Sequence, residues 1–171
     1  LTAEYAGITT EMRQVSQALG VRALAETDGE KLTEALPSLK NRVPDRAILR
    51  AFHFVDETAR VGEAVAALER DDVDAFLNAL VASGESSWKL LQNLYVPGSD
   101  NQEMPLALEM SRRMLAGHGA WRIHGGGFAG TILAFVPLDL LDTYRARMDA
   151  VFGAGATVAL SIRPEGAVVI Q

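Results

Sequence analysis

The chain has 171 residues, of which 49% are hydrophobic and 22% are charged, and it contains no cysteine. This is an ordinary globular composition with enough apolar material for a core. The lack of cysteine excludes disulfides, thiolate metal sites and a cysteine nucleophile. The formal net charge of −6 argues against a nucleic-acid surface, which needs clustered lysine and arginine.

No apolar run approaches the ~18 residues that a helix needs to cross a bilayer, so we expect no membrane as a partner. The longest run, 131–141, is broken by Pro137 and Asp139. Residues 1–5 have neither the basic region nor the apolar core of a signal peptide. Together with the lack of cysteine, these features predict a cytoplasmic protein. The chain also begins inside a predicted helix without an initiator methionine, which indicates a fragment of something longer.

The first two thirds of the chain predict helices. Between residues 5 and 19, apolar residues recur every three or four positions, and Gly20 is suited to end that helix. Asp28 can cap a second helix, which we expect to continue to Leu36 and to be limited by Pro37.

The longest predicted helix begins at Pro44, and its apolar side chains share one face. They are Ile48, Phe52, Val55, Val61, Val65 and Leu68. Asp71 or Asp72 caps the next helix, and we interpret both as caps and dipole partners. Glu4 and Glu11, near the start of the first helix, receive the same interpretation.

A further helix is predicted within 101–115. After it, the spacing of hydrophobic residues changes from that of a helix to that of a strand. The predicted order is strand 120–123, strand 131–136, helix 138–152, strand 156–162 and strand 167–170. This pattern predicts an α+β fold, in which a helical amino-terminal two thirds precedes a ββαββ unit with a mainly antiparallel, ferredoxin-like sheet packed by helices. We expect a single domain over 1–171, with one soft boundary near Gly117.

Gly125, Gly126 and Gly127 lie between the first two predicted strands, and Gly130 completes the pattern G-x-G-x-x-G. A dinucleotide site needs a helix after such a run, but the following residues predict a strand, which disfavours a Rossmann unit. Two glycines suffice for a tight turn. The surplus leaves two interpretations open: a plain link between antiparallel strands, or a place where a ligand or another backbone comes very near.

The segment 121–131, W-R-I-H-G-G-G-F-A-G-T, resembles the third signature of the GHMP small-molecule kinases. It is most similar to the galactokinase form, in which a strand ends in G-G-G-F-[GA]-G. The resemblance covers nearly the whole chain, through segments 1–20, 50–78, 86–115 and 162–167. It implies the carboxy-terminal domain of a galactokinase, with a GHMP kinase C-terminal type of fold.

For function, the resemblance implies a full-length galactokinase that uses ATP and Mg²⁺ to phosphorylate galactose at C1. In that family the phosphate loop and the sugar-binding carboxylate stretch lie in the amino-terminal half, and neither motif occurs here. We therefore expect no catalytic residue in this chain, no tight binding of ATP or Mg²⁺, and no activity in isolation. The implied partners are the missing amino-terminal kinase domain and galactose. The face that meets that domain is expected to be apolar and able to drive self-association.

The resemblance also implies site residues. The substrate-binding residues are Tyr5, Gly125, Gly126 and Gly127, with His124, Phe128 and Gly130 as further candidates. Ile8 and Thr9 stand where the family often carries paired arginines after the tyrosine. The three histidines lack the spacing of a metal site, so we predict none.

Two other functions stay open from the sequence. The chain could be a stand-alone ferredoxin-like module that binds a small molecule or mediates dimerisation. It could instead belong to a GHMP kinase for another substrate, such as mevalonate or homoserine. A phosphate loop encoded upstream of Leu1 would distinguish a kinase from the stand-alone module.

Overall fold

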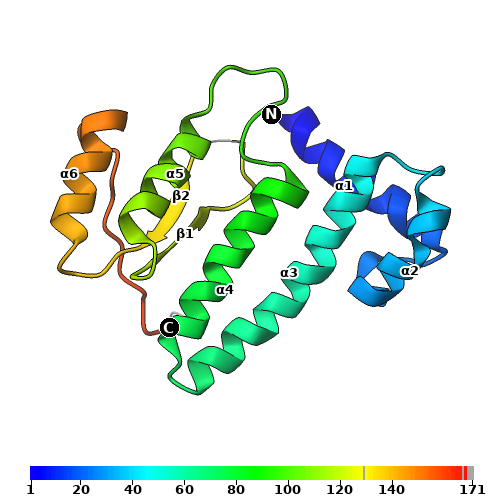
Figure 1. Cartoon of the computed structure of the whole chain (residues 1–171), viewed down its shortest axis with the longest axis horizontal. Helices are drawn as coiled ribbons and strands as arrows, with labels where there is room; N and C mark the ends of the chain where they lie inside the picture. The colour runs from blue at the N-terminus through cyan, green and yellow to red at the C-terminus, as the bar shows by residue number, and fades with distance from the viewer. Residues whose placement is uncertain (129, 167, 169–171) are drawn as a thin grey trace. The chain divides into compact units, whose positions relative to one another are not determined.

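The computed structural model describes residues 1–128, 130–166 and 168, and Figure 1 shows their course. The chain divides into two compact units, Leu1–Val136 and Pro137–Gln171. The elements of the first unit are α1 (Thr2–Leu19), the 3₁₀ turn η1 (Leu24–Glu26), α2 (Gly29–Leu39), α3 (Asp45–Glu69), α4 (Val73–Ser86), the π-helix η2 (Ser87–Leu91), α5 (Glu103–Leu115), β1 (Ala120–Ile123) and β2 (Ile132–Phe135). The second unit contains α6 (Leu141–Phe152).

Aspartate caps begin two of the helices, as predicted. Asp28 accepts the backbone N–H of Lys31 at 2.9 Å, and Asp72 accepts that of Ala75 at 3.0 Å. Pro37 does not end α2, which continues to Leu39. Because Leu39 is completely buried, its packing offsets the hydrogen bond that proline removes in the last turn.

The helical core lies where α1, α2 and α3 meet. Its completely buried members are Val15, Leu32, Leu39, Ala47 and Ala51. The amino-terminal half of α3 contributes to this core, but its carboxy-terminal half does not. Val61, Val65 and Leu68, which belong to the predicted apolar face, are 61%, 49% and 53% exposed. Helical spacing places side chains on one side of a helix, whereas only the neighbouring elements decide how much of that side is covered.

The sheet consists of β1 and β2 in antiparallel register, with Ala120 opposite Phe135 and Ile123 opposite Ile132. Helix α4 packs against β1, and Figure 1 shows the two side by side. The contact is close at Gly84, where a Cβ would stand 2.9 Å from the carbonyl oxygen of Trp121. Glycine at this helix position therefore lets α4 approach the strand that leads to the glycine run.

The α+β class is confirmed, but the second half of the predicted ββαββ sheet is not. Residues 156–162 form no strand, and Val158, Leu160 and Ile162 are 72%, 78% and 88% exposed. A strand is stabilised by a hydrogen-bonded neighbour, and among the described residues strand pairing is limited to β1 and β2. The predicted strand 167–170 lies, apart from Val168, outside the described residues.

The second unit is held locally around the end of α6. The carboxylate of Asp149 accepts hydrogen bonds from the backbone N–H groups of Gly155 and Thr157 and from the Thr157 hydroxyl, at 2.8–3.1 Å. Hydrogen bonding from Thr157 is the main reason that the pKa of Asp149 lies below its usual value. That the whole chain forms a single domain stays a prediction.

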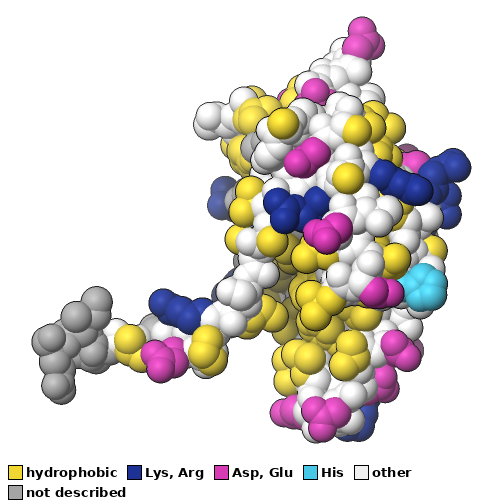
Figure 2. All heavy atoms as spheres, turned by 90° about the vertical axis from the view of Figure 1, so that its left-hand side faces the viewer, with side chains coloured by type: hydrophobic (Ala, Val, Ile, Leu, Met, Phe, Trp, Pro, Cys, Tyr) yellow, Lys and Arg dark blue, Asp and Glu magenta, His cyan; other side chains and the backbone are white. Residues whose placement is uncertain are grey.

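Charged side chains of both signs are interspersed with hydrophobic ones over the face drawn in Figure 2. None of the described helices combines the length and the hydropathy needed to span a bilayer.

Candidate functional site

Tyr5, near the start of α1, lies against the glycine run that follows β1. Its hydroxyl donates a 2.5 Å hydrogen bond to the carbonyl oxygen of Gly127. Its ring meets the ring of Phe128 edge to face, with centroids 5.4 Å apart and planes at 82°. The structure thus brings the predicted tyrosine and the predicted glycine run into direct contact, and 37% of Tyr5 remains exposed to solvent.

The three consecutive glycines are required for different steric reasons. Gly125 and Gly127 have φ angles of 67° and 83°, in the left-handed region that glycine adopts without strain. At Gly126 an added Cβ would lie 2.9 Å from Cε1 of Tyr5. At Gly127 it would overlap the carbonyl oxygen of Asn93. Gly126 has no left-handed backbone conformation, so the close approach of the Tyr5 ring accounts for the glycine at that position.

Asn93 is a site residue that the sequence interpretation missed. Its side-chain amide donates to the carbonyl oxygen of Gly126 at 3.1 Å, and its own carbonyl oxygen accepts the N–H of Phe128 at 2.7 Å. Asn93 is 2% exposed, and its Oδ1 is buried without a hydrogen-bond partner among the described residues. In the sequence Asn93 lies within segment 86–115 of the family resemblance, but no motif marks it as a site residue.

Two non-glycine residues beside this contact have left-handed backbone conformations. Gln92, which precedes Asn93, has a φ of 58°, and Phe128 has a φ of 56°. Such conformations are costly for residues with a Cβ and persist where surrounding contacts hold them. At Phe128 those contacts are the hydrogen bond to Asn93 and the ring of Tyr5.

The remaining predicted candidates lie at the ends of the glycine run. The N–H of His124 donates to the carbonyl oxygen of Thr131 at 3.0 Å, which extends the strand pairing by one step. His124, Gly125, Gly126 and Gly130 are exposed, whereas Gly127 and Phe128 are buried. At Gly125 and Gly130 no described atom lies within 4 Å of an added Cβ, so a ligand can approach the backbone closely there.

Within the described ranges, no three His, Cys, Asp or Glu side chains gather as ligands for one metal ion. Magnesium in phosphoryl-transfer sites is held by carboxylates and phosphate oxygens. We assign the described residues of this chain no step that involves a metal.

No family model matches the chain. The chain is 29% identical over 145 residues to the galactokinase of Glaesserella parasuis serovar 5 (strain SH0165) and 30% identical over 145 residues to that of Haemophilus influenzae (strain ATCC 51907 / DSM 11121 / KW20 / Rd). Each match covers 85% of this chain and 36% of the relative. The chain is homologous to the carboxy-terminal portion of galactokinases.

The structure of Lactococcus lactis galactokinase complexed with galactose has the same fold, with a TM-score of 0.73 and 22% sequence identity. The match covers 87% of this chain and 37% of that chain. The chain thus spans about a third of the length of the galactokinases that it matches. The predicted resemblance and the α+β fold of a GHMP kinase C-terminal domain are confirmed.

Proposed function

We propose that the full-length protein containing this chain is a galactokinase, which transfers the γ-phosphoryl group of ATP to the C1 hydroxyl of galactose. Within it, this chain forms one wall of the sugar and phosphoryl site. The observation that carries the proposal is the contact of Tyr5 with Gly126, Gly127 and Phe128. Homology to galactokinases supports the reaction, and the galactose-bound Lactococcus lactis relative supports the sugar.

Phosphoryl transfer requires a phosphate cradle with Mg²⁺, a group that orients the acceptor hydroxyl, and in-line positioning. This chain contributes to the last of these. The Tyr5 hydroxyl donates its hydrogen to Gly127, so its oxygen is left to accept a hydrogen bond from a sugar hydroxyl. The exposed backbone of Gly125 and Gly126 allows a substrate to lie against it.

The other requirements are assigned to the amino-terminal kinase domain, which is the proposed partner of this chain and the proposed holder of ATP and Mg²⁺. This division predicts that the isolated chain does not phosphorylate galactose. Measurable ATP-dependent phosphorylation by residues 1–171 alone would contradict it.

The test uses the full-length protein, ATP and a panel of sugars that includes galactose and N-acetylgalactosamine. Gly126→Val places a branched side chain where even an added Cβ would stand 2.9 Å from Cε1 of Tyr5. We expect the kcat/KM for galactose to fall by about tenfold or more, because the wall of the site must shift.

Gly62→Val is the matched control, because Gly62 lies in α3 with no atom within 4 Å of an added Cβ. It should leave the kinetics near those of the wild type. Absence of galactose phosphorylation by the wild-type protein, or unchanged kinetics in a folded Gly126→Val variant, would contradict the proposed function.

A further inference from the structure

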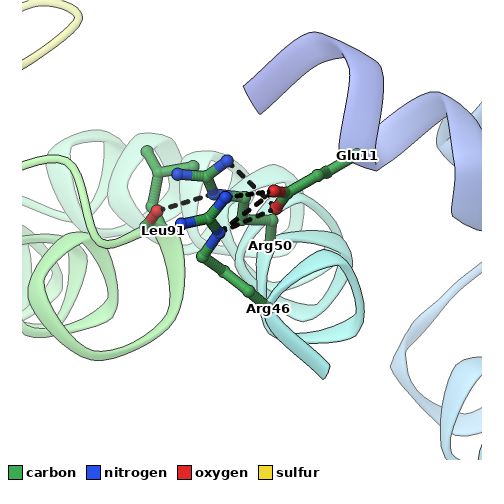
Figure 3. Close-up of polar contacts among 4 residues, drawn as sticks. All are labelled: Glu11, Arg46, Arg50 and Leu91. Carbon is green, nitrogen blue, oxygen red and sulfur yellow. Dashed lines mark hydrogen bonds and ion pairs between the residues drawn. The ribbon is translucent and has the colours of Figure 1, made fainter. Parts of the chain in front are cut away.

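Arg50 lies in α3 with only 2% of its side chain exposed, and it joins two other elements (Figure 3). Its Nη1 lies 3.0 Å from Oε2 of Glu11, and its Nε donates to the carbonyl oxygen of Leu91 at 3.1 Å. Glu11 is itself 12% exposed, in the middle of α1. It is therefore part of a buried ion pair, which corrects its interpretation as a partner of the helix dipole.

Arg46 binds the same carboxylate from the solvent side. Its Nη2 lies 2.5 Å from Oε1 of Glu11, and 44% of its side chain is exposed. Figure 3 shows both guanidinium groups converging on Glu11, while only Arg50 also reaches Leu91. The two arginines thus share one partner but differ in burial and in what they connect.

The two elements that Arg50 joins are those that hold the glycine run. Helix α1 carries both Glu11 and Tyr5, and Tyr5 binds the carbonyl oxygen of Gly127. Leu91 ends the π-helix two residues before Asn93, which binds the backbone of Gly126 and Phe128. The buried Arg50 guanidinium therefore connects α1, which carries Tyr5, to the end of η2, which leads to Asn93.

Burial of a charge is expensive, and an apolar side chain of similar size would fill the same space without that cost. Arginine offers what an apolar residue lacks, a rigid fork of donors that fixes two acceptors relative to each other. Here the acceptors belong to α1 and to the end of η2.

We propose that Arg50 is a positioning residue for the candidate sugar site. By joining Glu11 to the Leu91 carbonyl, it fixes the distance between Tyr5 and Asn93 and thereby the backbone conformation of residues 126–128. The effect on galactose rests on the proposed function, whereas the effect on the glycine run does not depend on it.

The first test measures amide hydrogen exchange in the full-length protein. Arg50→Met keeps the length and packing of the side chain but removes both contacts. We expect the Phe128 amide, which is bonded to Asn93, to exchange about tenfold faster or more, because the run opens locally. Core amides of α2, such as Leu32, should be unchanged. Arg46→Met is the control, and it should leave the Phe128 amide protected.

The second test separates positioning from a merely structural role by kinetics. A structural defect lowers the amount of active enzyme and leaves KM unchanged, whereas a misplaced wall raises the KM for galactose. We expect Arg50→Met to raise that KM several-fold, with Arg50→Lys intermediate because it keeps the charge but not the fork. If Arg50→Met does not fold, Glu11→Met tests the same bridge through the Phe128 amide, because it removes the acceptor of Arg50 and keeps the side-chain length.

An unchanged Phe128 amide in a folded Arg50→Met or Glu11→Met variant would overturn the inference. Equal acceleration of the Phe128 and Leu32 amides would overturn it too, since that result means general destabilisation. If the wild-type protein does not phosphorylate galactose, the proposed function fails, but selective exchange at Phe128 still supports the positioning role of Arg50.

Discussion

The hydroxyl of Tyr5 and the carbonyl oxygen of Gly127 are 122 residues apart in sequence and 2.5 Å apart in space. This hydrogen bond connects the first helix to the run between β1 and β2. Asn93 holds the same run from a third segment of the chain. The candidate site is therefore assembled from three separate stretches of sequence, and its shape depends on how each is held.

Replacement of Tyr5 by phenylalanine removes the hydroxyl and keeps the ring against Phe128. We expect the free energy of unfolding to fall by about 1 kcal/mol, the usual contribution of one hydrogen bond. In the full-length protein we also expect a several-fold higher KM for galactose. Urea unfolding and steady-state kinetics measure the two effects.

Tyr95→Phe is a suitable control for this change, because Tyr95 is 39% exposed, close to the 37% of Tyr5. It should change neither quantity appreciably. A normal galactose affinity in Tyr5→Phe would remove Tyr5 from the sugar site.

Alanine substitutions should separate the steric roles of two neighbouring glycines. Gly125→Ala introduces a Cβ into open space, so we expect only the cost of a left-handed backbone, about 1 kcal/mol. Gly127→Ala has the same backbone cost and also forces a Cβ against the Asn93 carbonyl, so we expect about 3 kcal/mol or more. The midpoints of urea unfolding, at constant m-value, measure the loss of stability in each variant. Equal losses in the two variants would show that the glycine run does not depend on the close contact with Asn93.

His53 should make the folded state less stable at mildly acidic pH. The side chain is 8% exposed, its Nδ1 lies 2.9 Å from the Ser86 hydroxyl, and burial lowers its pKa below the ordinary 6.5. Glu57 opposes this lowering, whereas Arg60 and Arg122 reinforce it. As pH falls below 6.5, the unfolded chain takes up the proton first, so stability decreases until the lower pKa of the folded state is reached.

The slope of that decrease is at most about 1.4 kcal/mol per pH unit for one proton. His53→Gln keeps a hydrogen-bonding side chain that does not titrate. Urea unfolding at several pH values above and below 6.5 should therefore give a free energy of unfolding that depends less on pH in the variant than in the wild type. If the free energy of unfolding falls equally with pH in the wild type and in His53→Gln, His53 is not the cause of the lower stability at acidic pH.

Features that depend on neighbouring residues could be predicted from the sequence. The caps at Asp28 and Asp72 follow from a side chain three positions before an unpaired backbone N–H. The change from helical to strand period marked the region of β1 and β2. The surplus of glycine between the two strands indicated close approach, and the Asn93 backbone is one of the groups that approaches.

Features that depend on distant residues could not be derived from spacing. Arg50 and Glu11 look like ordinary helix-surface charges in the sequence, and Asn93 looks like a loop residue. Tyr5 was grouped with the glycine run only through the family resemblance. In each case the deciding contact joins segments whose separation along the chain carries no information about their distance in space.

By itself, the sequence determined the α+β class, most of the helices and the resemblance to galactokinases, because these follow from local periodicity and short motifs. Only the tertiary structure decided that Arg50 is buried between α1 and η2, that Val61, Val65 and Leu68 of α3 are exposed, and that residues 156–162 form no strand. The physical reason is that burial and strand pairing depend on which surfaces meet. Which surfaces meet is set by the packing of the whole chain, which no single segment encodes.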